Sequence, residues 1–144
     1  MNVQDIISMW DQDCKINETE LGLESLKTSK LHNKYLKLFM SEKILNVKVR
    51  AEYKKVRRKL TEYYLGELDD KELKEYGRVQ FFKKLLKSEV EIYIESDDEY
   101  IDVVTRLSIQ DEKIDYVLSI LKAINTRGFA IKNAIDWEKL TQGI

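Results

Sequence analysis

Apolar side chains recur every three or four residues along most of this chain, which is the spacing that places them on one face of an α-helix. Near the amino terminus Val3, Ile6 and Trp10 follow this spacing and predict a short amphipathic helix. The stripe resumes at Leu21 and continues, with irregular steps, to Tyr63. The first half of the chain is therefore predicted to be helical.

Few residues interrupt the second stripe. Asn17 and Glu20 form a capping-box pattern that predicts its start, and Gly66 predicts its end. The chain has no proline, and no glycine lies between Gly22 and Gly66, so nothing forces a break. Residues 18–65 fit either one continuous helix or a bent helical hairpin.

Residues 67–95 give the least regular pattern. Gly77 weakens the helical spacing, and Val90, Ile92 and Ile94 alternate with other residues at the two-residue period of a β-strand. Residues 71–88 are compatible with a helix, and the strand period follows at residues 90–94, so the pattern leaves the structure of this connector open.

Residues 96–144 carry the most regular pattern, which opens with a second capping box at Ser96 and Glu99. Apolar residues then step by three and four, as in the a and d positions of a heptad repeat. Such a seam packs either on the first half of the same chain or on another copy, and its narrow width favours self-association. The residues assigned to oligomerisation are Tyr100, Val103, Leu107, Ile114, Val117, Leu121, Ile124, Ile131 and Ile135.

Composition supports a mostly α-helical protein with a single domain, because 144 residues include only five glycines and no proline. The patterns divide this domain, residues 1–144, into a basic helical half (1–66), the connector (67–95) and the oligomerisation helices (96–144). The amino terminus resembles neither a secretion signal nor a membrane span, and a single cysteine, Cys14, fits a reducing cytoplasm.

Charge is distributed very unevenly along a chain whose net charge is only −1. Between Lys27 and Lys59 twelve lysines and arginines accompany only two acidic residues, Glu42 and Glu52. Like charges at helical spacing repel one another, so a polyanion stabilises such a segment, and nucleic acid is the first candidate. The residues assigned to nucleic-acid binding are Lys30, Lys34, Lys37, Lys48, Arg50, Lys54, Lys55, Arg57, Arg58 and Lys59.

Aromatic residues indicate which nucleic acid this segment suits. Tyr35 and Tyr53 lie within it, and Phe81 and Phe82 lie beside Lys83 further on. Bases of a single strand stack on such rings with little regard to sequence, whereas no helix-turn-helix or zinc-finger spacing for reading a duplex is visible. We expect non-specific binding of a single strand. A solvated helix face is the alternative for the lysines, and core packing is the alternative for the tyrosines.

Nothing in the sequence predicts catalysis. His32 is the only histidine and has no partner at metal-ligand spacing, and Cys14 lies among acidic residues that disfavour a thiolate. The acidic clusters at Asp69 and Asp97 fit helix starts better than metal ligands. A nuclease would lack groups to activate water. We expect no enzyme activity, no metal and no cofactor.

The carboxyl-terminal stretch Arg127-Gly128-Phe129-Ala130-Ile131-Lys132 resembles the end of the UvsY family, the recombination mediators of T-even-like bacteriophages. Weaker similarity extends over nearly the full length. The family carries a basic K-A-R-L motif implicated in binding single-stranded DNA, and the nearest match here is Arg57-Arg58-Lys59-Leu60. In this match Arg58 replaces a small residue.

The resemblance implies a homo-oligomeric ring, hexamer or heptamer, with the carboxyl-terminal helix contributing to assembly. It also implies a non-enzymatic role in the cytoplasm of the bacterial host: loading the phage RecA-like recombinase onto single-stranded DNA covered by the phage single-strand-binding protein. The residues alone leave another hypothesis open, an oligomeric structural adaptor whose basic half docks onto an acidic protein partner.

Overall fold

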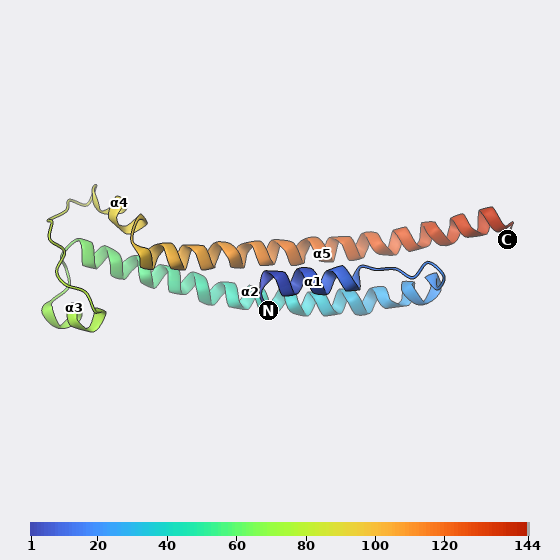
Figure 1. Ribbon diagram of the computed structural model, residues 1–144, viewed down its shortest axis with the longest axis horizontal. Helices are drawn as coiled ribbons and strands as arrows, with labels where there is room; N and C mark the ends of the chain where they lie inside the picture. The colour runs from blue at the N-terminus through green and yellow to red at the C-terminus, as the bar shows by residue number, and fades with distance from the viewer. Residues whose placement is uncertain (144) are drawn as a thin grey trace. The chain divides into compact units, whose positions relative to one another are not determined.

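The computed structural model describes residues 1–143, and these residues form α-helices and no β-strand (Figure 1). The prediction of a mostly α-helical protein is therefore confirmed. The helices are α1 (Val3–Asp13), α2 (Leu21–Tyr64), α3 (Asp70–Tyr76), α4 (Val90–Glu95) and α5 (Asp98–Gln142).

Helix α2 is one uninterrupted helix, which decides between the two arrangements that the sequence left open for residues 18–65. It begins at Leu21 and not at Asn17, because the Asn17 side chain accepts the backbone N–H of Thr19 and forms a turn instead of a helix cap. It ends at Tyr64, just before Gly66 as predicted, and the φ of Gly66, +73°, lies in the left-handed region that favours glycine.

The strand predicted near the end of the connector is wrong, because Val90–Glu95 is helix α4. Val90 and Ile94 are buried, whereas Ile92 is 72% exposed. Burial thus follows the four-residue spacing of a helix and not the alternation of a strand. The described residues also offer no neighbouring strand with which this segment could pair.

The second predicted cap, Ser96, lies one residue before the residue that caps the helix. Helix α5 begins at Asp98, and the backbone N–H of Glu99 donates to the side chain of Asp97 at 2.9 Å. Asp97 is therefore the capping residue, while the Ser96 hydroxyl donates to the carbonyl of Ile92 at the end of α4. The general expectation that these acidic clusters cap helices is confirmed, since Asp69 caps α3 in the same way.

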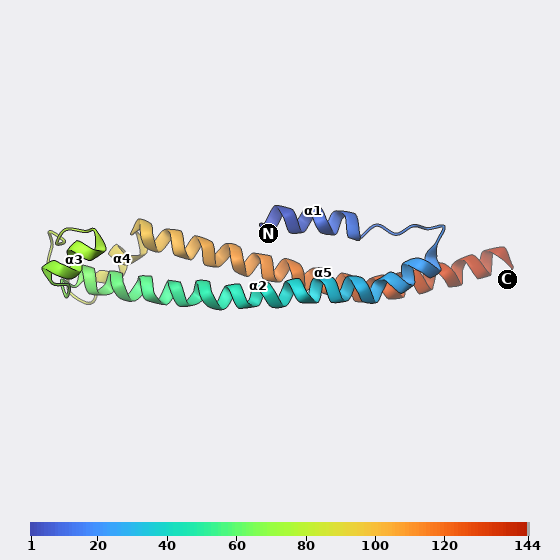
Figure 2. The ribbon, with the colours of Figure 1, turned by 90° about the horizontal axis from the view of Figure 1, so that it is seen from below.

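The chain forms two compact units, and α2 and α5 contribute to both. Unit 1 comprises Met1–Ile44 with Asp111–Ile144, and unit 2 comprises Leu45–Gln110. Within each unit the portions of α2 and α5 run side by side in opposite directions (Figure 1, Figure 2). Helix α1 belongs to unit 1, and helices α3 and α4 belong to unit 2.

The core of unit 1 joins all three of its helices. Ile6 from α1 and Tyr35 from α2 are fully buried with apolar residues of α5, and Trp10 meets the Tyr35 ring edge-on at a centroid distance of 5.4 Å. Arg127 is buried as well, with its Nη2 2.6 Å from the Glu24 carboxylate. Arg127 belongs to the family-like carboxyl-terminal stretch, so part of that stretch serves packing within unit 1.

The core of unit 2 is rich in aromatic residues. Leu60, Tyr63 and Tyr64 from α2 pack with apolar residues of α3, α4 and the connector between them. Phe81 lies against the Tyr64 ring at 5.0 Å and 82°, an edge-to-face geometry that favours aromatic pairs. This core fixes the connector against the end of α2.

Many residues of the predicted heptad seam are buried within this chain and do not need a second copy to cover them. Ile6 of α1 and Tyr35 of α2 fill part of the seam in unit 1, so the alternative of packing on the first half of the chain accounts for these positions. The physical reason is that α1 and α2 supply the partner helices that a seam needs. The buried seam residues are Val103, Val117, Leu121, Ile124 and Ile131, and the half-buried ones are Tyr100, Leu107, Ile114 and Ile135.

Candidate nucleic-acid interface

The basic residues of α2 in unit 2 project away from its core. Leu60, Tyr63 and Tyr64 bury the apolar side of the helix, which leaves the lysines and arginines on its other sides. The exposed residues are Lys48, Arg50, Lys54, Lys55 and Arg58, and the half-buried ones are Arg57 and Lys59.

Arg57 already has an anionic partner. Its Nη2 donates to both carboxylate oxygens of Glu91 on α4, at 2.6 and 2.8 Å. The hydrogen bonds to Glu91 raise the pKa of Arg57, which remains charged in any case. A phosphate would have to compete with Glu91 for this side chain, so Arg57 is less available than its position in the basic segment predicts.

Arg58 and Lys59 differ in how available they are to a phosphate. The Arg58 side chain is 81% exposed, and its Nε lies 3.3 Å from the carboxylate of Glu62, one helical turn away. Exposed pairs of this kind contribute little stability and exchange readily with other anions. Lys59 instead places its ammonium over the Tyr76 ring, 5.5 Å from the centroid.

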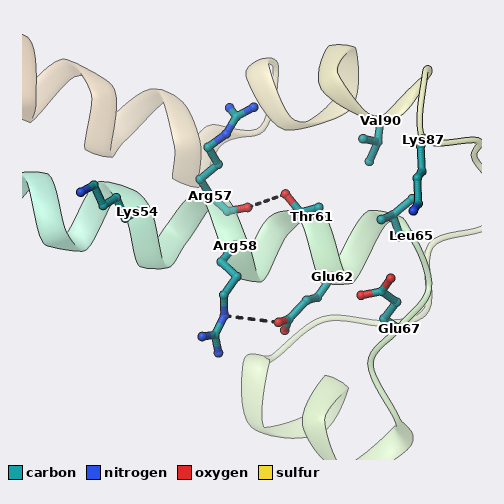
Figure 3. A pocket seen from close by; sticks show the side chains of 9 residues that line it. All are labelled: Lys54, Arg57, Arg58, Thr61, Glu62, Leu65, Glu67, Lys87 and Val90. Atoms are coloured by element: carbon teal, nitrogen blue, oxygen red, sulfur yellow. Dashed lines mark hydrogen bonds and ion pairs between the residues drawn. The ribbon is translucent and has the colours of Figure 1, made fainter.

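A surface cavity of about 690 Å³ lies at this end of α2 (Figure 3). The side chains of Arg57 and Arg58 extend to opposite sides of the helix, and Lys87 reaches the cavity from the connector (Figure 3). The lining residues are Lys54, Arg57, Arg58, Thr61, Glu62, Leu65, Glu67, Lys87 and Val90. Four cationic side chains against two carboxylates suit an anionic ligand, while the apolar residues add contact area.

Three of the nearby lysines are free to meet that ligand. Lys54, Lys55 and Lys87 are exposed, and no carboxylate within residues 1–143 forms an ion pair with them. Lys87 was not among the residues assigned from the sequence. Its proximity to Lys83 and Lys84 was the available signal, but only the fold shows that it faces the same cavity as Lys54.

The basic residues of α2 in unit 1 are also unequal. Lys34 donates to Asp13, which accepts the Tyr35 hydroxyl as well, at 2.8 Å. Burial alone would raise the pKa of Asp13, but the hydrogen bonds from Lys34 and Tyr35 outweigh it and lower the pKa. Lys34 therefore ties α1 to α2, whereas Lys30 and Lys37 are exposed without an ion pair in the described part of the chain.

An internal network holds the connector of unit 2 in place. Asp97 accepts both terminal nitrogens of Arg78, at 2.7 and 3.0 Å, and the hydroxyl of Tyr64, at 2.6 Å. Arg78 also reaches Glu99, which accepts the hydroxyl of Tyr76 at 2.6 Å. Burial would raise the pKa of Asp97, yet the bonds from Arg78 and Tyr64 hold it below its usual value. The network joins the end of α2, α3 and the start of α5.

The residues that line the cavity are mostly cationic and apolar. Among residues 1–143, no cluster of histidine, cysteine and carboxylate side chains has the geometry to hold a metal ion. None of the helices in that range is both long enough and apolar enough to cross a membrane. The arrangement at the cavity can bind an anion through positive charge.

Known proteins similar to this chain belong to one family. Residues 9–144 match the family described as "Recombination, repair and ssDNA binding protein UvsY". The recombination protein uvsY of Enterobacteria phage T4 is 27% identical over 143 residues, which cover 99% of each chain.

Solved structures of the bacteriophage T4 recombination mediator protein UvsY have the same fold. One crystal form gives a TM-score of 0.87 at 26% identity, covering 99% of this chain and 98% of the other. A second form gives 0.86 at 25% identity, covering 97% and 99%. The resemblance seen in the sequence is thereby confirmed, and this chain belongs to the UvsY family of recombination, repair and single-stranded DNA binding proteins.

Proposed function

We propose that this protein is a recombination mediator that binds single-stranded DNA without sequence preference through the cationic side chains around the unit 2 cavity. The observation that carries the proposal is the pair of exposed cations that line it, Lys54 and Lys87, together with the exposed Lys55 next to Lys54 on α2. None of the three has a carboxylate partner in the described residues. Phosphates recur along any strand, so contacts to them give affinity without reading bases.

The basic residues assigned from the sequence contribute to different degrees in this proposal. Lys48, Lys54, Lys55 and Arg58 contact phosphates most readily because they are exposed. Arg57 contributes only when it leaves Glu91. In the stretch that matches the family's K-A-R-L motif, one arginine is strongly exposed: Arg58, which stands where the family has a small residue. Lys30 and Lys37 of unit 1 are further candidates for phosphate contact, whereas Lys34 is occupied by Asp13.

We also propose that copies of the chain associate, as a hexamer or heptamer, through unit 1. Several large apolar side chains of this unit are exposed, and a second copy would remove them from water. These side chains replace the buried heptad residues as the first candidates for the interface. They are Leu26, Met40 and Ile44 of α2 and Phe129, Trp137 and Leu140 of α5.

Association supports the mediator role because it multiplies weak contacts. Each subunit offers a few phosphate contacts, and linking several subunits raises their local concentration along one strand. A strand held at several points bends over the assembly, which loosens the single-strand-binding protein that covers it. The exposed stretch then gives the RecA-like recombinase a place to nucleate in the cytoplasm of the bacterial host.

Removal of two free charges tests the binding site. Lys54→Gln combined with Lys55→Gln should weaken binding of single-stranded DNA and reduce the slope of log affinity against log salt by about 1.4, at about 0.7 for each lost phosphate contact. The matched control is Lys71→Gln combined with Lys74→Gln, which removes the same charge from exposed positions of α3. Equal salt slopes for both double variants would contradict the proposed site.

A loading assay then tests the mediator role and separates it from the structural adaptor. Recombinase activity on a strand covered by single-strand-binding protein should rise with the unchanged protein, rise with the α3 control and stay low with the Lys54 and Lys55 variant. If the unchanged protein ignores DNA but is displaced from an acidic protein partner by a competing polyanion, the adaptor hypothesis replaces the mediator.

A further inference from the structure

Phe82 is the most exposed of the large hydrophobic residues in the described part of the chain, at 89%. It lies in the connector between α3 and α4, directly before Lys83 and Lys84. A phenylalanine at this exposure gains nothing from the core of unit 2. Its position directly before two lysines therefore calls for another explanation.

The neighbouring residue, Phe81, shows that the connector is anchored at this point. The Phe81 ring lies 5.0 Å from Tyr64 and 5.3 Å from Tyr93, both in edge-to-face geometry. Phe82 lies next to Phe81, at a centroid distance of 4.8 Å and an interplanar angle of 48°. The aromatic cluster thus supports one side of the Phe82 ring while the rest of the ring faces solvent.

The cations around Phe82 continue the proposed DNA interface. Lys84 and Lys87 are exposed and form no ion pair within residues 1–143. Lys87 lines the 690 Å³ cavity together with Lys54. Phe82 and Lys84 line a second cavity of about 320 Å³, and Leu65 is common to the linings of both cavities.

We infer that Phe82 is a stacking platform for one base of the bound single strand, with Lys84 and Lys87 holding the adjacent phosphates. This inference rests on the proposed function and adds a contact to the base where the α2 residues contact only the backbone. Aromatic rings stack on any base, so the contact preserves binding without sequence preference.

The exposure of the ring favours a base over an apolar peptide anchor. A hydrophobic anchor from a protein partner is held in a well-packed pocket that excludes water. Phe82 instead projects from the surface, and the cavity beside it is lined by Lys83, Lys84 and Gln80 as well as by aromatic rings. A planar base can cover a projecting ring while its phosphates meet the lysines.

Phe82→Ala tests the inference in the full-length protein with a short oligothymidylate. Loss of one stacked base should weaken binding by about 5- to 150-fold. The salt slope should not change, because no phosphate contact is removed. The matched control is Leu86→Ala, which truncates another exposed apolar residue (69%) of the same connector and should leave affinity unchanged.

Two further arms identify the base as the partner of the ring. An abasic oligonucleotide keeps the phosphates, so Phe82→Ala and the unchanged protein should bind it equally. Phe82→Trp should retain affinity for oligothymidylate, and its added fluorescence should be quenched on binding. Circular dichroism should show the same helix content in every variant, because Phe82 lies outside the core.

The outcomes separate this inference from the proposed function. If Phe82→Ala binds oligothymidylate as tightly as the unchanged protein, while the Lys54 and Lys55 variant is weakened, the stacking role is wrong and the DNA site stands. If Phe82→Ala and Leu86→Ala are weakened alike, the patch is an apolar contact and the stacking role is again wrong. If the unchanged protein binds no oligonucleotide in dilute salt, both proposals fail.

Discussion

Asp97→Ala should destabilise unit 2 by removing the acceptor at the centre of its polar network. Asp97 accepts two hydrogen bonds from Arg78, one from the Tyr64 hydroxyl and one from the backbone of Glu99. The variant leaves the Arg78 guanidinium with Glu99 as its only anionic partner in the network, at 3.1 Å. It also removes the cap of α5.

The magnitude follows from the two losses. Breaking a buried ion pair by removing one partner costs about 3–5 kcal/mol, but Arg78 is a quarter exposed and keeps Glu99, so we expect about 2 kcal/mol from this source. Loss of a helix cap adds about 1 kcal/mol. Asp97→Ala should therefore lower the free energy of unfolding by about 3 kcal/mol.

Urea denaturation followed by circular dichroism measures this cost. The control is Asp98→Ala, which removes the adjacent exposed carboxylate and loses only a helix-dipole interaction of about 0.5 kcal/mol. A double variant with Arg78→Ala should be less destabilised than the sum of the single variants, by about 1–2 kcal/mol. Costs that are equal for Asp97→Ala and Asp98→Ala, or strictly additive for Asp97 and Arg78, would refute the network as a source of stability.

The pH dependence of the same variant gives an independent check. The network holds the pKa of Asp97 below its usual value, so its stabilisation is complete above the unfolded-state pKa of about 4 and is lost as pH falls through the lower folded-state value. The difference in unfolding free energy between Asp97→Ala and the unchanged protein should therefore shrink in strong acid. A constant difference from neutral pH to pH about 2 would contradict this assignment.

Three other predictions address the helix end, the tyrosine and the seam. Gly66→Ala should destabilise by about 1 kcal/mol because its φ is +73°, whereas Gly22→Ala, in open space within α2, should stabilise by about 0.5–1 kcal/mol; thermal denaturation compares them. Burial and the hydrogen bond to Asp97 raise the pKa of Tyr64 to about 12. The stability that the Tyr64 hydroxyl contributes should therefore be complete below pH about 10 and decline toward pH 12. This decline should be absent in Tyr64→Phe. Ile124→Ala should lower the unfolding free energy by about 2–5 kcal/mol because Ile124 is fully buried. Leu118→Ala, at a partly exposed position of α5, should lower it by under about 1 kcal/mol. Similar small costs for both variants would show that the seam is not part of the core.

Local patterns predicted the features that depend on a few neighbouring residues. The helical stripe ending at Gly66 corresponds to α2, and the acidic residue Asp69 caps α3 as expected. The family-like stretch at Arg127 was also visible in the sequence, and the comparisons confirmed the family. Local patterns failed where two periods were compatible: Val90–Glu95 alternates like a strand but lacks a neighbouring strand and forms a helix.

For the candidate binding residues, the structure shows which are exposed and which already have partners. The basic segment correctly identified exposed cations such as Lys54, Lys55 and Arg58. It could not show that Glu91 occupies Arg57, because those residues are 34 positions apart. Lys34 is held by Asp13 for the same reason, at a separation of 21 positions.

The sequence alone determined that this protein is helical, strongly polarised in charge and related to a family of single-stranded DNA binding proteins. Helix periodicity and capping act over one or two turns, and charge density is a sum over residues, so both can be read along the chain. Only the tertiary structure decided which cations have no carboxylate partner and that α1 and α2 partly fill the heptad seam. It also decided that Phe82 is exposed and that Lys87 lines the same cavity as Lys54. These features depend on contacts between segments distant in sequence, because burial and ion pairing arise only when the helices pack.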